Sequence, residues 1–236
     1  MKTETKKTAP KRTSRKTAPG FSFPPDTVAF LGELRANNNR EWFTANKTRY
    51  DLMVKQPALD FCDHIAAALG DLTGLPHGSK VFRVNRDVRF SKDKTPYKAY
   101  LHMLFQPSHS ANAPKWFFGL EPDKLVLGTG IFGFEKSALL TYRQRVAGAD
   151  GQALHKQLER MRKAGMRTRE PELKRVPSGF DADLPQADLL RHKGLTAWLD
   201  MPGGPTAATK PDIVKTSIAG FKKLQPLFNW LNDPDA

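Results

Sequence analysis

The order of hydrophobic and polar positions predicts three helices in the first third of the chain. In residues 26–37, apolar residues recur at the spacing of one helix face, and Asp26 is the expected N-cap. The second helix should open with Asn38 and Glu41, which stand three residues apart as in a capping box. The third should open with Pro57, because proline suits the first helical turn.

Between residues 81 and 132 the period of the pattern changes to two, which is typical of strands. The clearest strand patterns are VFRV, PYKAYLHMLF, KWFFGLEP and KLVLGTGIF. In the second of these, one face would carry Tyr97, Ala99, Leu101, Met103 and Phe105. The connections are too short for crossover helices, so we expect a mainly antiparallel sheet.

Helical spacing returns after Glu135 and continues to the end of the chain, apart from irregular stretches. A short apolar piece, LTAWL at 195–199, should add an edge strand, and a strongly amphipathic helix follows at 213–231. Helices on both sides of a run of strands predict an α+β fold, with a mainly antiparallel sheet flanked by N-terminal and C-terminal helices. We expect a single α+β domain over residues 21–236.

The first 20 residues have a different composition and are expected to form a disordered basic tail. They contain seven Lys/Arg, one Glu and two prolines, and no aromatic residue. Such a segment cannot bury enough apolar surface to offset its ordering entropy. It lacks the apolar run of a secretory signal, and no part of the chain approaches the ~20 apolar residues of a membrane span. We therefore expect a cytoplasmic protein without a membrane partner.

The net charge of +14 is concentrated in two places. The tail carries +6, and residues 80–100 carry +5, from seven Lys/Arg and two Asp. Subtracting both from +14 leaves +3 for the remaining residues. This distribution favours a local anion site over a protein whose whole surface is adapted to DNA.

The basic segment contains a candidate anion-binding cluster. Its members are Arg83, Arg86, Asp87, Arg89, Lys94 and Tyr97. The arginine forks match phosphate or carboxylate, the lysine adds a point charge, and the tyrosine hydroxyl can donate to an oxyanion. The aspartate could orient an arginine or act as a base. The alternative is an internal ion-pair network in which these charges satisfy one another.

Arg86 is the exception within this segment. If residues 82–90 were one strand, Arg86 would fall on its apolar face. An unpaired guanidinium there would cost several kcal/mol, so either an acid pairs with it or the strand breaks at that point.

The same segment carries a resemblance to a known family. The pattern RxxRDxRFxxDKxxY, over residues 83–97, resembles the signature of the bacterial conserved hypothetical proteins called domain of unknown function 2461. NNNREWF (37–43), LVLGTGIF (125–132) and LKRVPSGFDADLP (173–185) are similar to other parts of that family, so the resemblance covers about residues 26–200. One position departs, because Leu184 stands where the family often has histidine. The resemblance implies the fold class and the site location, but no reaction.

Two further polar groups could share a cleft with the cluster. Asn38, Asn39 and Arg40 lie at an expected helix start, where free backbone amides attract anions. Lys174 and Arg175 form a second basic pair on an expected loop.

Other chemistry finds little support in the sequence. The single cysteine, Cys62, excludes an internal disulfide framework, and the six histidines show no paired metal-ligand spacing, so no metal is expected. GTGIFG lacks the Lys-Ser/Thr of a P-loop, and no GxSxG element is present. The sequence identifies no catalytic residue and no cofactor. Three functions stay open: binding of a small anionic molecule, nucleic-acid binding through the tail and the basic segment, and a non-catalytic structural role.

Overall fold

The computed structural model describes residues 20–110 and 112–233, so the predicted tail lies outside the described residues except for Gly20. A six-stranded sheet forms the middle layer, in the order β1-β2-β3-β4-β6-β5, and all neighbouring strands are antiparallel. The strands are β1 (His77–Val81), β2 (Leu101–Pro107), β3 (Lys115–Leu120), β4 (Leu125–Ile131), β5 (Arg167–Thr168) and β6 (Leu195–Asp200). The predicted α+β class and the mainly antiparallel sheet are confirmed.

Helices stand on both sides of the strands in the sequence, as the pattern predicts. The N-terminal group is α1 (Pro25–Ala36), α2 (Arg40–Ala45), α3 (Lys47–Tyr50), the π-helical turn η1 (Asp51–Lys55) and α4 (Gln56–Thr73). The later group is α5 (Lys136–Ala147), α6 (Ala149–Lys163), α7 (Ala187–Leu190), the 3₁₀ turn η2 (Gly204–Thr209) and α8 (Ile213–Asn232). None of the helices in the described part of the chain has the length and apolar character that a membrane crossing requires.

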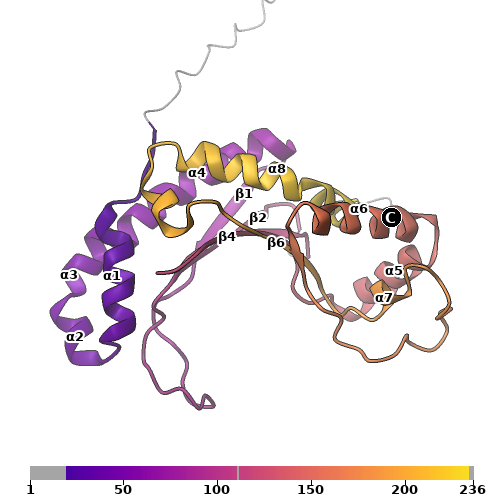
Figure 1. The fold of residues 1–236 in the computed structure, drawn as a ribbon, viewed down its shortest axis with the longest axis horizontal. Helices are drawn as coiled ribbons and strands as arrows, with labels where there is room; N and C mark the ends of the chain where they lie inside the picture. The colour runs from indigo at the N-terminus through magenta and orange to yellow at the C-terminus, as the bar shows by residue number, and fades with distance from the viewer. Residues whose placement is uncertain (1–19, 111, 234–236) are drawn as a thin grey trace, which may run out of the picture.

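One face of the sheet is covered by α4 and α8, which lie side by side above it in Figure 1. Trp116 of β3 stacks on Phe228 of α8, with ring centroids 4.4 Å apart. The ring centroids of Phe118 and Phe61 of α4 are 4.6 Å apart. These fully buried rings fix the two helices on the sheet, because aromatic residues bury large apolar areas.

The other face of the sheet is concave, and no helix of the described residues lies over it in Figure 1. In Figure 1 the sheet arches between the α1–α3 group at one end and the α5–α7 group at the other, and the space beneath the arch is left open by the ribbon.

The strands stop short of the basic segment. Residues 82–100 link β1 to β2 as irregular chain, so the predicted strand VFRV is wrong beyond its first residue. From Leu101 onward the predicted alternation holds, and Leu101, Met103 and Phe105 are buried. The end of β1 also resolves the conflict at Arg86, which lies beyond the strand.

Three smaller predictions are corrected. Asp26 lies in the first turn of α1 and not at its N-cap. Its carboxylate does not cap the helix but accepts hydrogen bonds from Arg49. Asn39 and not Asn38 caps α2, and its side chain accepts a hydrogen bond from the Trp42 amide at 2.8 Å. LTAWL forms β6, but this strand lies between β4 and β5, so it is not an edge strand.

Candidate functional site

Residues 82–100, called the basic arm below, extend from the β1–β2 edge of the sheet. Figure 1 shows the arm projecting beyond the sheet, on the concave side and next to the α1–α3 group. Near its root the two halves of the arm are joined by backbone hydrogen bonds, from Lys98 to Val84 at 2.7 Å and from Arg86 to Pro96 at 2.9 Å. The arm is therefore a hairpin with a paired root and an irregular tip.

Tyr97 holds the root of the arm against the helical layer. Its ring is 9% exposed and stacks on Phe43 of α2, with centroids 4.1 Å apart. Asn38 donates from Nδ2 to the Tyr97 carbonyl at 2.9 Å and accepts from the Tyr97 amide at 3.0 Å. The structure thus gives Tyr97 a role in positioning the arm.

Arg86 is engaged by residues of the arm itself. Its guanidinium donates to the Asp93 carboxylate and to the Thr95 hydroxyl. The pKa of Asp93 is lowered to about 2, first because it accepts the Thr95 amide and then because Arg86 donates to it. This small network closes the arm above its tip.

Arg89 and Lys94 are also bonded within the arm. Arg89 donates to both oxygens of Asp87, at 3.0 and 2.7 Å, and this bonding lowers the pKa of Asp87. Lys94 donates to the Val88 carbonyl at 3.0 Å. Both cations remain at the surface, so their pairing is local and open to water.

Arg83 differs from the other arginines of the predicted cluster. It is exposed, and no hydrogen-bond or ion-pair partner for it exists among the described residues. Lys98 and Lys80 place their ammonium groups 5.7 and 5.8 Å from the centre of the Phe82 ring. The pKa of Lys98 is lowered by burial first, and then by the positive charges of Arg83 and Arg86. The root of the arm thus gathers Arg83, Lys80 and Lys98, which form no ion pair within the described residues, although the charge of Arg83 helps to lower the pKa of Asp87.

A hollow of about 270 Å³ on the concave face is lined by one of these cations, Lys98. Its lining is mainly aromatic and consists of Phe82, Lys98, Tyr100, His102, Leu104, Phe117 and Phe132. Tyr100 stacks on His102 at 4.0 Å. Burial lowers the pKa of His102, although Glu121, 3.3 Å from its Nε2, acts in the opposite direction. A neutral imidazole is a flat surface suited to stacking.

The structure brings together part of the predicted cleft. Asn39 and Arg40 follow Asn38, which contacts the arm, so they lie near its root. Lys174 and Arg175 follow β5, at the opposite edge of the sheet from β1 and β2. Five strand steps separate the two edges, which is about 24 Å. Lys174 and Arg175 therefore do not share a cleft with the arm.

Sequence reasoning missed the aromatic lining beside the cations. Tyr100, His102 and Leu104 alternate with the buried residues of β2, so their period of two was a usable signal. Two further lining residues, Phe117 and Phe132, come from β3 and the end of β4, and sequence spacing does not show that they meet there.

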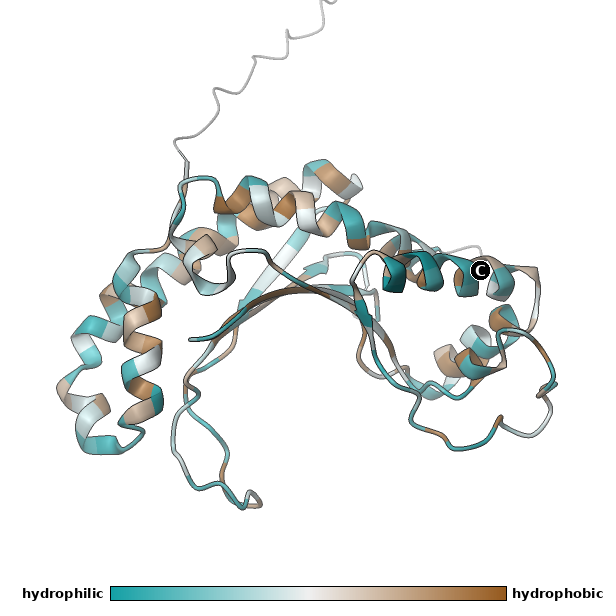
Figure 2. Cartoon of the chain, viewed as in Figure 1, coloured by the Kyte–Doolittle hydropathy of each residue, from teal (hydrophilic) through white to brown (hydrophobic). Residues whose placement is uncertain are grey.

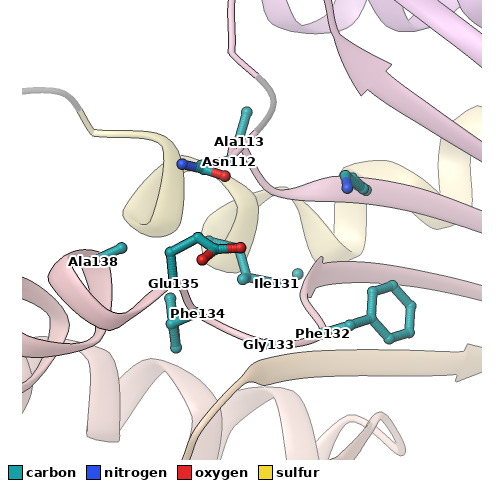
Figure 3. A pocket seen from close by; sticks show the side chains of 10 residues that line it. Asn112, Ala113, Ile131, Phe132, Gly133, Phe134, Glu135 and Ala138 are labelled. Carbon is teal, nitrogen blue, oxygen red and sulfur yellow. The ribbon is translucent and has the colours of Figure 1, made fainter.

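A second hollow, of about 180 Å³, lies at the end of β4 and is shown in Figure 3. The side chains of Asn112 and Glu135 face this space from two different loops. The carboxylate of Glu135 makes this hollow less suited to an anion than the aromatic one. The site at the root of the arm is the stronger candidate.

The fold and the site define an α+β protein with one open sheet face and a basic hairpin at its edge. The chain matches the model of the family described as "Conserved hypothetical protein (DUF2461)" over residues 26–230. The match covers most of the chain, so the protein belongs to this family. None of the curated proteins compared with the chain matches it.

Proposed function

We propose that the protein binds a phosphate-bearing ligand with a flat ring, such as a nucleotide, at the root of the basic arm. The observation that carries the proposal is the group of cations at the root of the arm that form no ion pair within the described residues, one of which, Lys98, lines an aromatic hollow. Arg83 and Lys98 would hold the phosphate, since both can donate charge-assisted hydrogen bonds. Tyr100 and His102 would stack on the ring of the ligand.

The other members of the predicted cluster would act around this centre. Arg86, Arg89 and Lys94 add positive potential, but each already has a partner within the arm. An anion would have to compete with the Asp87 and Asp93 carboxylates for them. We therefore expect Arg83 and Lys98 to contribute more to binding than these three residues.

Isothermal titration with nucleoside 5′-monophosphates, the matching nucleosides and inorganic phosphate tests this proposal. Arg83→Ala and Lys98→Ala should each weaken nucleotide binding by about tenfold or more, the value of a charge-assisted hydrogen bond. Arg89→Ala is the matched control and should change the affinity by less than about threefold, because exposed and locally paired charges contribute little.

The proposal would be wrong if no nucleotide bound, or if Arg83→Ala and Lys98→Ala bound as the unchanged protein does. Nucleosides binding as tightly as nucleotides would contradict the role given to the cations. Melting curves of each variant would show that the loss of binding is not a loss of fold.

A further inference from the structure

One row of paired residues crosses the concave face from edge to edge. Successive partners in the strand register are Lys80, Leu104, Phe117, Gly128, Trp198 and Arg167. Because directly paired residues point to the same face of a sheet, all of them belong to the open face. The row has cations at its two ends and aromatic residues between them.

Aromatic rings form a continuous strip along and beside this row. Ring centroids are 4.9 Å apart for His102 and Phe117, 5.1 Å for Phe117 and Trp198, and 5.7 Å for Trp198 and Phe132. Tyr100 extends the strip, since it stacks on His102 at 4.0 Å. Figure 2 shows hydrophobic residues along the strands of the arch, where no helix lies beneath them. The strip is partly exposed, because each of these residues keeps some solvent contact.

Two glycines allow the rings to lie against the sheet. A Cβ atom at Gly128 would be 2.6 Å from a ring carbon of Trp198, and one at Gly119 would be 2.7 Å from a ring carbon of Phe117. Such distances are too short for real contacts, so each ring occupies the space above a glycine. Each of these two rings is thereby held close to the strands. Neighbouring rings of the strip from His102 to Phe132 meet edge to face, at interplanar angles of 69°, 79° and 67°, so the strip, called the platform below, offers separate ring faces and not one flat surface.

The charges around the platform are mainly positive. Lys98 lines the hollow at the root of the arm. Lys80 and Lys115 line a third hollow, of about 500 Å³, and Lys115 also lines the one at the end of β4. Leu104 and Phe132 also line two hollows each, so the three hollows adjoin one another. Two of the nearby acids are already paired, Glu121 with His102 and Lys124, and Asp200 with Arg167 at 2.7 Å, whereas the Glu135 carboxylate lines the hollow at the end of β4.

We propose that this face binds single-stranded nucleic acid, with bases stacked on the strip from Tyr100 to Trp198 and phosphates held by the surrounding lysines. The inference rests on the proposed nucleotide site and extends it across the sheet. A strip of aromatic residues with lysines around it suits an unpaired strand, whose bases can stack without sequence readout.

The dimensions of the strip are consistent with several nucleotides. From β2 to β6 the register crosses three strand steps, which is about 14 Å. A stacked strand rises about 3.4 Å per nucleotide, so the strip can accept about four bases. A mononucleotide would use only the end of the strip at the arm.

Fluorescence anisotropy with labelled single-stranded RNA and DNA of about eight nucleotides tests the proposal on the full chain. Four phosphate contacts predict a fall of about 50-fold in affinity between about 50 and 200 mM salt. Trp198→Leu removes one stacking surface and should weaken binding to the single strand by about tenfold. Phe90→Leu is the matched control, because Phe90 is 96% exposed on the arm and lies outside the strip.

The outcomes separate this proposal from the nucleotide site. If Trp198→Leu leaves mononucleotide binding intact and weakens the single strand, the platform is supported. If mononucleotides bind but single strands bind no more tightly, the platform is wrong and the nucleotide site stands. If neither binds, both proposals fail.

Three other results would also overturn the platform. Binding that is unchanged by Trp198→Leu would point to the basic tail, residues 1–20. Equal affinity for a duplex would exclude base stacking as the source of binding. A dimer that Trp198→Asp dissociates, measured by light scattering, would show that a second copy of the chain covers this face.

Discussion

Asn38 and Asn39 are adjacent and chemically identical, yet they have different partners. The side chain of Asn39 accepts a hydrogen bond from the nearby Trp42 amide of α2. Asn38 reaches a residue 59 positions away, and its amide pairs with both backbone groups of Tyr97. The side chain of Asn38 thus makes the two hydrogen bonds to Tyr97 that the backbone of a neighbouring strand would otherwise make. This pairing connects the N-terminal helices to the arm.

Replacing Asn38 by Ala should loosen the root of the arm. The change leaves a partly buried amide and a partly buried carbonyl of Tyr97 without partners, so we expect a loss of about 2 kcal/mol in the free energy of unfolding. Urea denaturation measures the loss, and hydrogen exchange should quicken at residues 82–98. Asn37→Ala is the control, because Asn37 is exposed and bonds only within its own helix end.

An unchanged free energy of unfolding together with unchanged exchange would contradict the role of Asn38. Faster exchange without global destabilisation would show that the arm opens as a separate unit.

At the scale of elements, the arm is neither strand nor helix because its polar groups satisfy one another locally. Arg86, Asp93 and Thr95 form one closed network, and Asp87 and Arg89 form another. Side chains that bond to nearby backbone groups compete with regular strand pairing. The residues that carry the family resemblance therefore determine the conformation of the tip of the arm as well as its charge.

Arg86→Lys should open the tip of the arm without unfolding the protein. A lysine keeps the charge but lacks the planar fork that reaches Asp93 and Thr95 together. We expect chymotrypsin to cut severalfold faster after Phe90, while the melting temperature of the whole protein stays the same. Arg89→Lys is the matched control, since Arg89 bonds only to its near neighbour Asp87. Equal cleavage rates in both variants would contradict the network.

At the scale of the whole molecule, the sequence predicts which segments form strands and helices better than it predicts where each of them lies in the fold. Strand patterns with short turns between them give β3 and β4 directly, and Glu121 bonds to Lys124 across their turn at 2.9 Å. The position of β6 inside the sheet depends on the pairing of Arg167 and Thr168 with it, and two residues carry too little pattern to predict a strand. Which sheet face stays open depends on where distant helices pack.

The same limits apply to the site. The cations of the arm are visible in the sequence because they are contiguous. The platform is not, because Phe117, Trp198 and Phe132 come from different strands or strand ends and meet only through the sheet register. Two of the sequence-predicted residues, Lys174 and Arg175, stand at the far edge for the same reason.

Histidines at three distant places make the stability of the whole molecule depend on pH. Burial lowers the pKa of His77, His102 and His192 below 6.5. The folded protein therefore binds fewer protons at these sites than the unfolded chain does. Stability from these groups is fully present above about pH 7 and is lost as the pH falls below about 6.5, because the unfolded chain then takes up protons first.

Urea denaturation at about pH 7.5 and about pH 5.5 should show this loss, at up to about 1.4 kcal/mol per pH unit for each histidine. This range lies above the pH at which the acids with lowered pKa, Asp26 and Glu33 among them, lose their contribution. His192→Gln should reduce the slope of the free energy of unfolding against pH by as much as the contribution of one proton, even if it lowers stability at every pH. A protein that became more stable between pH 7.5 and 5.5 would contradict the assignment, because protonation would then favour the folded state.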